Sequence, residues 1–313
     1  MGTKALILAA GFGTRLKPLT DQLPKALLPF FGPTLLDYAI RRVRVAGVQE
    51  IAVNAHHLGD LIKSHLDRAE YRDIKLSYEQ EILGTGGAVN PLRAWIGTDD
   101  LLIFNADIVS DIDLSALLEH HRKSLAAATM LLLPTVLPGK NPVFATDDQV
   151  TGVGLATPAK KQDVRGTART FACAHVLSPK FLSTIAPVGF VDIIPVYKAQ
   201  LAAGARIGAA FHPGFWRDLG TPAEFWEAYA TVFTDFARYD HQLGMSELSR
   251  RLRIDDDATM IDSLVYVGSG SAVGHGTHLD HAVVLPGTKV APGQSLSYVL
   301  IGANSMIKLS KQD

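Results

Sequence analysis

The sequence contains one cysteine, Cys173, among its 313 residues. A single thiol excludes an intrachain disulfide and any metal cluster held by several thiolates. Cys173 lies in the apolar run 171–177, where we expect a small buried residue rather than a reactive thiol. The chemistry of this chain therefore has to come from other residue types.

Excess charge and long apolar runs are lacking as well. Lys and Arg number 30 against 31 Asp and Glu, which gives a formal net charge of −1 and no general attraction to nucleic acid or anionic membranes. The first apolar run is short and breaks at Gly11, unlike a signal peptide, and no later run approaches the roughly 20 residues of a membrane-spanning helix. We therefore expect a cytoplasmic protein without nucleic-acid or membrane partners.

Apolar segments typical of strands alternate with helical patterns in the first part of the chain. The expected strands are 4–10, 51–54, 74–78 and 101–105, and the expected helices are 35–46, 58–69 and 88–96. This alternation predicts an α/β fold with a Rossmann-like, mostly parallel sheet flanked by helices. Ligands of such sheets bind beyond the carboxyl ends of the strands, where Gly11, Gly84 and Asp107 fall.

A different period begins after about residue 245. Apolar residues recur every six positions, with one slip of a single residue, at Ile261, Val267, Val273, Leu279, Val284, Val290 and Leu296. Glycines and Pro-Gly pairs separate them. This period fits neither a helix nor a simple hairpin but suits a short parallel β-helix, with an irregular β-hairpin extension as the alternative.

The segment 8–16 places a glycine-rich turn directly after a buried strand. Gly11 and Gly13 let the backbone turn with its N–H groups facing an anion, and Arg15 and Lys25 can add charge-assisted hydrogen bonds to phosphate oxygens. A dinucleotide fingerprint would need a third glycine, and a P-loop would need Gly-Lys-Ser/Thr. The segment predicts a phosphate cradle, and a plain strand-to-helix turn with a surface arginine is the alternative.

Four motifs then occur in order over roughly the first 230 residues. They are Gly-x-Gly-Thr-Arg-Leu-x-Pro-Leu-Thr (11–20) with Pro-Lys-x-Leu-x-Pro (24–29), Glu-Ile-Leu-Gly-Thr-Gly-Gly (81–87), Phe-Asn-Ala-Asp (104–107) and Phe-Trp-Arg-Asp-Leu-Gly-Thr-Pro (215–222). In these motifs the chain resembles the sugar-1-phosphate nucleotidyltransferases, or NDP-sugar pyrophosphorylases. The resemblance implies transfer of a nucleoside monophosphate from a nucleoside triphosphate to a sugar 1-phosphate, with release of pyrophosphate.

The resemblance also implies roles for four charged residues. Arg15 would stabilise the departing pyrophosphate, and Lys25 the triphosphate or the transition state. Asp107 and Asp218 would supply carboxylates to Mg²⁺, a cation that prefers oxygen ligands. Such a reaction needs no covalent nucleophile, because positioning and charge neutralisation carry it.

Nucleotide and sugar phosphate are assigned to further residues on the same basis. The implied nucleotide-binding residues are Leu8, Ala9, Ala10, Gly11, Gly13, Thr14, Gln80, Gly84, Thr85 and Gly86. Asn105 is assigned to the sugar phosphate. The lysine that many relatives carry in a Glu-Lys-Pro triplet is absent, since 156–158 reads Ala-Thr-Pro, and Lys160 or Lys161 could reach the phosphate instead.

Two features favour different substrates. The family's usual Asn-Ala-Gly is Phe-Ala-Cys at 171–173, a form similar to the branch that acts on N-acetylmuramate 1-phosphate. The 81–85 motif and the C-terminal repeats resemble mannose-1-phosphate guanylyltransferases. We predict GTP and mannose 1-phosphate, with uridylyl transfer to N-acetylmuramate 1-phosphate or glucose 1-phosphate as the alternative. A catalytically silent regulatory subunit and, from the repeats, an acyltransferase are alternatives of other classes.

The predicted domains are a catalytic domain at 1–240, a linker at 241–255 and a left-handed parallel β-helix tail at 256–313. Two or three coils are too few to bury a core alone, so the tail should pack against the catalytic domain or form a symmetric homo-oligomer. His275, His278 and His281 in this tail are expected to be surface residues. The pair at 56–57, His-His, is expected to begin a helix rather than bind a metal.

Overall fold

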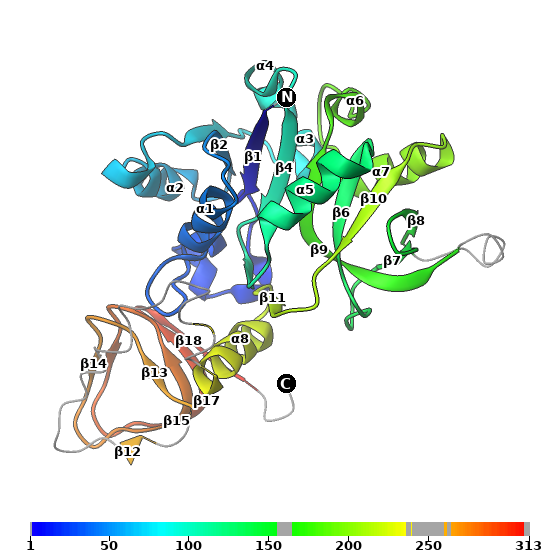
Figure 1. Cartoon of the computed structure of the whole chain (residues 1–313). Coiled ribbons are helices and arrows are strands. Elements are labelled where there is room, and N and C mark those ends of the chain that lie inside the picture. The colour runs from blue at the N-terminus through cyan, green and yellow to red at the C-terminus, as the bar shows by residue number, and fades with distance from the viewer. Residues whose placement is uncertain (1, 155–164, 236–238, 240–259, 262–263, 310–313) are drawn as a thin grey trace. The chain divides into compact units, whose positions relative to one another are not determined.

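The computed structural model describes residues 2–154, 165–235, 239, 260–261 and 264–309 (Figure 1). The chain divides into two compact units. Unit 1 comprises Met1–Gly11, Ala39–Ala106 and Ile112–Trp216, and unit 2 comprises Phe12–Tyr38, Asp107–Asp111 and Arg217–Asp313. Each unit is therefore assembled from segments that are distant in the sequence.

Unit 1 contains a nine-stranded sheet in the order β10-β6-β9-β4-β1-β2-β3, extended by β7 and β8. Its strands are β1 (Thr3–Leu8), β2 (Ile51–Ala55), β3 (Lys75–Tyr78), β4 (Asp100–Asn105), β6 (Ala128–Leu133), β7 (Pro142–Ala145), β8 (Val150–Val153), β9 (Thr167–Leu177) and β10 (Ile207–Phe211). Strand β1 is parallel to β2 and β4, whereas β9 runs antiparallel to β4 and β6. The predicted α/β sheet is confirmed, and it is a mixed sheet.

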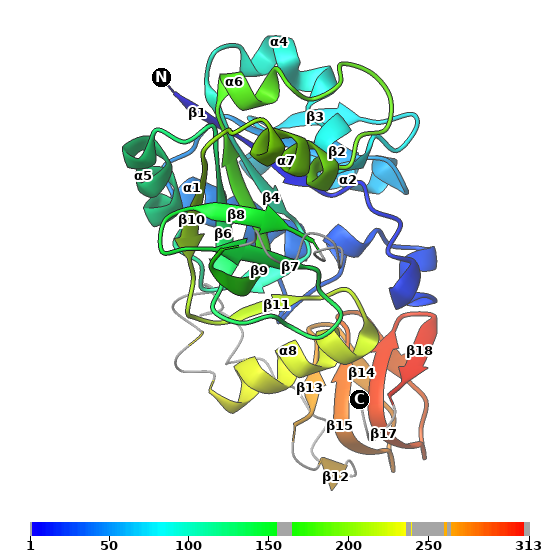
Figure 2. The same ribbon diagram turned by 90° about the vertical axis from the view of Figure 1, so that its right-hand side faces the viewer.

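Helices accompany these strands, with α5 and α7 beside the sheet (Figure 2). Helix α1 (Leu35–Val45) crosses from unit 2 into unit 1. The other helices of unit 1 are α2 (Gly59–Leu66), η4 (Ala69–Tyr71), α3 (Gly84–Gly87), η5 (Asn90–Leu92), α4 (Arg93–Ile96), α5 (Leu114–Ser124), α6 (Pro179–Leu182) and α7 (Ile193–Ala202). The single helix predicted at 88–96 is instead divided, because Pro91 lacks the N–H that a continuous helix would use.

The central strands of unit 1 are buried on both faces. Ala5, Leu6 and Ile7 of β1 and Leu102 and Ile103 of β4 have no exposed surface. Strands covered on both sides carry continuous apolar runs rather than an alternating pattern, and this is why the sequence identified them readily. Strand β1 ends at Leu8, earlier than the predicted Ala10.

Cys173 occupies an irregularity in β9. The pairing of β6 with β9 shifts register between Met130 and Leu132, and Cys173 has φ +58°, in the left-handed region. It is half-buried rather than buried as expected. A non-glycine residue in this conformation is uncommon, so the strand carries local strain where the resemblance places a glycine.

Unit 2 contains helix α8, the C-terminal strands and the signature loop (residues 12–31), which holds most of the first motif. Its elements are η1 (Thr14–Leu16), η2 (Leu19–Asp21), η3 (Lys25–Leu27), β5 (Ile108–Ser110), β11 (Trp216–Asp218, whose first residue lies in unit 1), α8 (Pro222–Thr234), β12 (Met260–Ile261), β13 (Tyr266–Val267), β14 (Ala272–Val273), β15 (His278–Val284), β16 (Lys289–Val290), β17 (Ser295–Gly302) and β18 (Ser305–Lys308). The predicted linker 241–255 lies outside the described residues.

The C-terminal strands stack in parallel, with paired residues eighteen positions apart between β12 and β15 and seventeen apart in the later pairs. Leu279 pairs with Leu296 and Val273 with Val290, seventeen positions apart in both cases. From Val267 onward, the residues of the six-residue period thus lie above one another in pairs and contribute to a small apolar core. The stack ends with β18, which pairs antiparallel with β17.

Helix α8 lies along the stacked strands within unit 2 (Figure 2). Trp226 Nε1 donates a hydrogen bond to the carbonyl of His281, and the His281 ring stacks on Tyr298 with centroids 4.6 Å apart. His281 is therefore a packing residue, not the surface residue that we expected, whereas His275 is exposed. Among the described residues, no helix has both the length and the apolar character needed to cross a membrane.

Candidate active site

Three of the predicted catalytic residues lie together in unit 2. The Lys25 ammonium is 2.5 Å from Oδ2 of Asp107 and 3.5 Å from Oδ1 of Asp218. The Lys25 side chain is 12% exposed, that of Asp218 13% and that of Asp107 26%, so the cluster is largely but not fully withdrawn from water. One cation between two carboxylates leaves a local negative charge that can attract further cations.

Short elements bring these side chains together. Asp107 follows β4 and precedes β5, and Asp218 is the last residue of β11, which pairs with β5. The N–H of Leu219 donates to the carbonyl of Asp107 over 3.0 Å, which fixes the two acidic residues side by side. Lys25 begins η3 directly after Pro24, whose extended backbone sets the start of that turn.

The two carboxylates fit a divalent cation. Oδ1 of Asp107 is buried and has no hydrogen-bond partner among the described residues, which is costly unless a ligand or ion supplies one. No group of three or more His, Cys, Asp or Glu side chains in the described part of the chain is placed to hold a metal. Two carboxylates suffice for Mg²⁺, which commonly takes its other ligands from water and substrate phosphates.

Arg15 lies in η1 and packs across Gly220. A Cβ atom built on Gly220 would be 2.5 Å from Nη2 of Arg15 and 3.1 Å from Oε2 of Glu224. Thr221, the next residue, caps α8 by accepting a hydrogen bond from the Glu224 N–H, and its hydroxyl donates to the Glu224 carboxylate. In the Asp-Leu-Gly-Thr-Pro motif, the Asp is thus a carboxylate of the cluster, the Gly leaves space for the Arg15 side chain, and the Thr caps the N-terminus of α8.

The glycine-rich turn owes its shape mainly to Gly13. Gly13 has φ +62°, and its carbonyl accepts hydrogen bonds from the Thr20 hydroxyl and the Leu16 N–H. A Cβ at Gly13 would lie 3.0 Å from Thr20 and 3.2 Å from Lys25. Gly11, at the end of unit 1, is exposed with open space around it, and Thr14 is the first residue of η1.

In unit 1, a buried hydrogen-bond chain joins the two predicted nucleoside-binding segments. The N–H of Ala9 donates to Oδ1 of Asn54, and Nδ2 of Asn54 donates to Oε1 of Glu79. Oε2 of Glu79 accepts from the N–H of Leu83, the residue before Gly84. Asn54 and Glu79 are each only 3% exposed, so this chain fixes the spacing between the end of β1 and the glycine turn.

The predicted nucleotide-binding residues lie around this chain. Leu8 ends β1, and Ala9 and Ala10 follow it as buried residues. Gln80 is exposed, whereas its neighbour Glu79 is buried. Sequence reasoning missed Asn54 and Glu79, although each is a polar residue at the end of an apolar strand, a signal that could have found them.

The glycine turn of α3 is held by a neighbouring segment. The N–H groups of Gly86 and Gly87 both donate to the carbonyl of Val191, and the Val191 N–H donates to Leu83. A Cβ on Gly84, which has φ +77°, would lie 2.6 Å from the Val191 carbonyl oxygen. The Thr85 hydroxyl accepts from the N–H of Ile193. Gly86 and the Thr85 side chain therefore help to hold the turn in shape.

The predicted sugar-phosphate residues are only partly described. Asn105 is the half-buried last residue of β4, opposite Leu8 of β1. Lys160 and Lys161 lie outside the described residues. The Trp216 indole donates a hydrogen bond to the Ala172 carbonyl over 3.0 Å, and the Lys140 ammonium lies 5.9 Å from the Trp216 ring. The Phe-Ala-Cys segment is thus held by the Phe-Trp-Arg-Asp motif.

Burial keeps two groups of unit 1 uncharged. His175 is 3% exposed, and burial lowers its pKa to about 3. Its Nδ1 lies 2.7 Å from the hydroxyl of Tyr197, whose pKa is raised by burial. This pair is structural, since both residues belong to the apolar core of the sheet.

Comparison with known proteins finds a family similarity in the first half of the chain. Residues 4–151 match the nucleotidyl transferase family, and these residues include the glycine turn, Lys25 and Asp107. Over these residues the chain is similar to that family. The likeness to known sugar-1-phosphate nucleotidyltransferases continues beyond the matched residues.

Two relatives illustrate this likeness. Mannose-1-phosphate guanylyltransferase of Mycobacterium tuberculosis is 28% identical over 225 residues, which cover 71% of this chain and 62% of that protein. N-acetylmuramate alpha-1-phosphate uridylyltransferase of Neisseria meningitidis is 29% identical over 236 residues, which cover 72% of this chain and 97% of that protein. The match with the guanylyltransferase thus spans less than two thirds of that relative.

Solved structures share the fold. UDP-glucose pyrophosphorylase from Acinetobacter baumannii superposes with a TM-score of 0.65, covering 80% of this chain and all of that chain at 17% identity. At this identity the likeness concerns the fold alone, a mixed sheet flanked by helices.

Proposed function

We propose that this protein transfers a nucleoside monophosphate from a nucleoside triphosphate to a sugar 1-phosphate, giving a nucleoside diphosphate sugar and pyrophosphate. The sugar phosphate oxygen attacks the α-phosphorus, and the bond from that phosphorus to the bridging oxygen of pyrophosphate breaks. The observation that carries this proposal is the cluster in which Lys25 lies between Asp107 and Asp218.

Cationic side chains lower the cost of bringing two anionic substrates together. In the proposed reaction Lys25 binds triphosphate oxygens, and the carboxylates of Asp107 and Asp218 hold its ammonium group in place. Arg15 stabilises the charge that develops on pyrophosphate as it leaves. Only interactions that are stronger in the transition state than in the bound substrate raise turnover. In this proposal, loss of Arg15 therefore lowers kcat, whereas loss of a simple phosphate contact would raise KM alone.

Asp107 and Asp218 are the residues that would hold Mg²⁺. When bound there, the ion neutralises phosphate charge and favours the leaving of pyrophosphate. The unpartnered buried oxygen of Asp107 supports this assignment. In this proposal the carboxylates also orient the Lys25 ammonium, which lies 2.5 Å from Asp107 and 3.5 Å from Asp218.

Nucleoside binding is assigned to backbone groups of unit 1. In this proposal, the chain contacts the nucleoside at Ala9 and at the turn that begins at Gly84. The Asn54–Glu79 hydrogen bond keeps these two segments at a fixed spacing, so that the base enters a preformed site. Asn54 and Glu79 act here as positioning residues.

GTP and mannose 1-phosphate are the proposed substrates, supported by the likeness to mannose-1-phosphate guanylyltransferases. The second candidate is uridylyl transfer to N-acetylmuramate 1-phosphate. It is favoured by Phe171, which replaces the family's usual asparagine, and by the match over nearly the whole length of the Neisseria relative. Glucose 1-phosphate remains a further acceptor to be tested.

The test is a panel of four nucleoside triphosphates against mannose, glucose and N-acetylmuramate 1-phosphates, with pyrophosphate release as the readout. Rapid release with one pair identifies the substrates. A folded protein that binds a triphosphate but releases no pyrophosphate with any pair would indicate the silent regulatory subunit instead. Omitting the sugar phosphate controls for simple triphosphate hydrolysis.

The domain organisation forms a second part of the proposal. Residues 1–240 would form the catalytic domain, 241–255 a linker and 256–313 a left-handed β-helix. The parallel stacking at seventeen-residue intervals supports a β-helix, and its left-handed winding is the proposed element. Light scattering of the full chain would test the homo-oligomer that we expect from so short a stack.

A further inference from the structure

The Tyr229 hydroxyl of α8 holds the chain just after Lys25. It accepts a hydrogen bond from the Phe31 N–H over 3.1 Å and donates one to the Pro29 carbonyl over 3.1 Å. Tyr229 is 2% exposed, and burial raises its pKa well above the usual tyrosine value, so it remains a donor. One side chain thus satisfies a donor and an acceptor of the segment that leads away from Lys25.

The Tyr229 ring is also the centre of an aromatic cluster. Its centroid is 4.5 Å from that of Phe31, 4.7 Å from that of Phe30 and 5.1 Å from that of Tyr266. Tyr266 of β13 also contacts Phe31, with centroids 5.0 Å apart. The aromatic cluster thus combines side chains of α8 and the signature loop with Tyr266 of the C-terminal stack.

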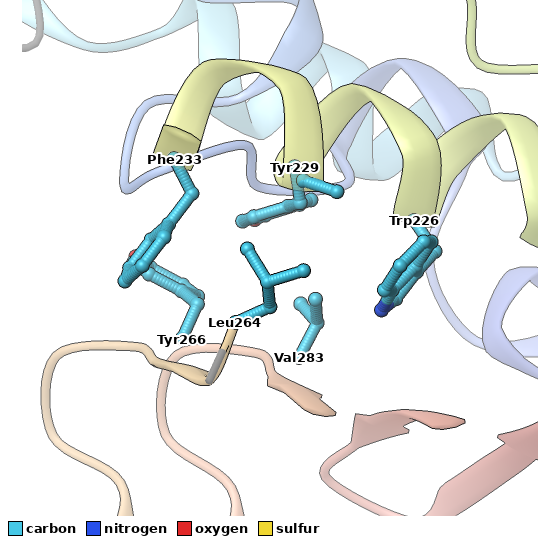
Figure 3. A pocket seen from close by; sticks show the side chains of 7 residues that line it. Trp226, Tyr229, Phe233, Leu264, Tyr266 and Val283 are labelled. Atoms are coloured by element: carbon cyan, nitrogen blue, oxygen red, sulfur yellow. The ribbon is translucent and has the colours of Figure 1, made fainter. Parts of the chain in front are cut away.

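The packing of α8 on the stack is tight. The cavity between them measures only about 10 Å³, which is barely enough for one water molecule. Figure 3 shows its aromatic and aliphatic side chains facing one another across this small gap. The lining residues are Trp226, Tyr229, Ala230, Phe233, Leu264, Tyr266 and Val283. Motion of the stack against α8 would therefore disturb Tyr229 directly.

The stack touches the loop on the other side of Lys25 more loosely. Asn304 donates a hydrogen bond to Gln22, and a Cβ on Gly302 would lie 2.7 Å from the Leu19 side chain. This contact borders a cavity of about 290 Å³, so the packing here is less complete than in the Tyr229 cluster. Together with the hydrogen bond from the Tyr38 hydroxyl to the Phe30 carbonyl, the Tyr229 cluster is therefore one of the contacts that hold the segment after Lys25.

We propose that Tyr229 is a positioning residue for Lys25, and that the C-terminal strands contribute to turnover by holding Tyr229 through Tyr266. This inference rests on the proposed function. Lys25 has to meet phosphate oxygens whose positions change little during the reaction, and small displacements of such a group are costly. The tail would then support catalysis as well as any assembly.

The test compares single substitutions in the full chain. Tyr229→Phe removes both hydrogen bonds but keeps the ring, and Tyr266→Ala removes the supporting ring while Tyr266→Phe keeps it. We expect Tyr229→Phe and Tyr266→Ala to lower kcat roughly tenfold or more with little change in KM for the triphosphate. Tyr266→Phe and Tyr197→Phe, a buried tyrosine substitution in unit 1, should retain wild-type kcat.

A cycle with Lys25→Met separates positioning from general stability. If Tyr229 acts through Lys25, then adding Tyr229→Phe to Lys25→Met should not lower the residual activity further. Fully additive losses, or wild-type kcat in Tyr229→Phe, would overturn the inference. So would an equal loss of kcat in Tyr197→Phe at the same melting temperature.

Hydrogen exchange of segment 24–31 provides a readout that needs no turnover. Exchange in this segment should accelerate in Tyr229→Phe and Tyr266→Ala and remain unchanged in Tyr197→Phe. An unchanged rate of hydrogen exchange in segment 24–31 of Tyr229→Phe would contradict the positioning role of Tyr229, even in a protein that released no pyrophosphate. Absence of pyrophosphate release from the wild type, with the exchange result as expected, would count against the proposed function alone.

Discussion

Arg15 occupies the space that a side chain on Gly220 would need, since a Cβ there would come within 2.5 Å of the guanidinium. Arginine can swing aside at little cost in stability, but it would then leave its place. We expect Gly220→Ala to lower kcat about tenfold while the melting temperature stays near the wild-type value. Steady-state kinetics and thermal unfolding measure the two effects. In an Arg15→Ala background the same substitution should have no further effect on kcat.

Removal of either acidic charge beside Lys25 should be more damaging. Asp107→Asn and Asp218→Asn should each lower turnover on the order of 100-fold, because each removes a charged oxygen ligand for the divalent cation. Both variants should fold, since the two carboxylates lie outside the apolar core. Titration with Mg²⁺ should restore part of the activity, and full activity in EDTA would contradict the metal assignment.

Glu79→Gln tests the buried chain between Ala9 and the glycine turn. The amide can accept from Asn54 or from Leu83 but presents N–H groups to the other donor, so one bond is lost and two donors oppose each other. We expect the free energy of unfolding to fall by about 1–3 kcal/mol. KM for the triphosphate should rise more than KM for the sugar phosphate. Equal changes in both Michaelis constants would argue against a role in nucleoside binding.

Cys173→Gly should stabilise the protein. The left-handed backbone at φ +58° costs a side chain roughly 1–2 kcal/mol, whereas glycine adopts it freely. Glycine also gains entropy in the unfolded chain, which offsets part of this, so we expect a net gain of up to about 1 kcal/mol. Chemical denaturation measures it. Cys173→Ala is the control, because it removes the thiol but keeps the strain.

Acid should destabilise unit 1 through His175. Its pKa is about 3 in the folded protein and near 6.5 when exposed, so the unfolded chain binds the proton first. The contribution of this residue to stability is complete above pH 6.5 and declines as the pH falls toward 3. A melting-temperature series over this range should show the decline, and His175→Asn should make it shallower. Parallel curves for the two proteins would assign acid sensitivity to other groups.

The sequence predicted those features that repeat or that bury continuous apolar runs. Strands β2 and β4 fall within one residue of their expected bounds, and Leu279 lies above Leu296 as the six-residue period requires. Lys25 lies beside Asp107 and Asp218, and the roles that the family resemblance implied for these residues stay a prediction.

Other features depend on contacts between distant positions and leave no local pattern. The antiparallel direction of β9 depends on its partners β4 and β6, and strand composition does not encode direction. Asn54 and Glu79 each stand at the end of a strand, but no local pattern predicts that they are hydrogen-bonded to each other. The hydrogen bonds of Tyr229 join positions 198 and 200 apart in the sequence, and its local sequence does not predict them.

The number of residues in each coil of the C-terminal stack restricts which insertions and deletions this region can accept. From β13 onward, paired residues of the parallel strands are seventeen positions apart, so an insertion or deletion there keeps the apolar side chains in register only if it adds or removes a whole coil. Strand β18 runs backwards against β17 and so covers the last open edge. Additional coils would therefore have to be inserted before β17. We expect relatives with longer stacks to differ by insertions there rather than by extensions at the C-terminus.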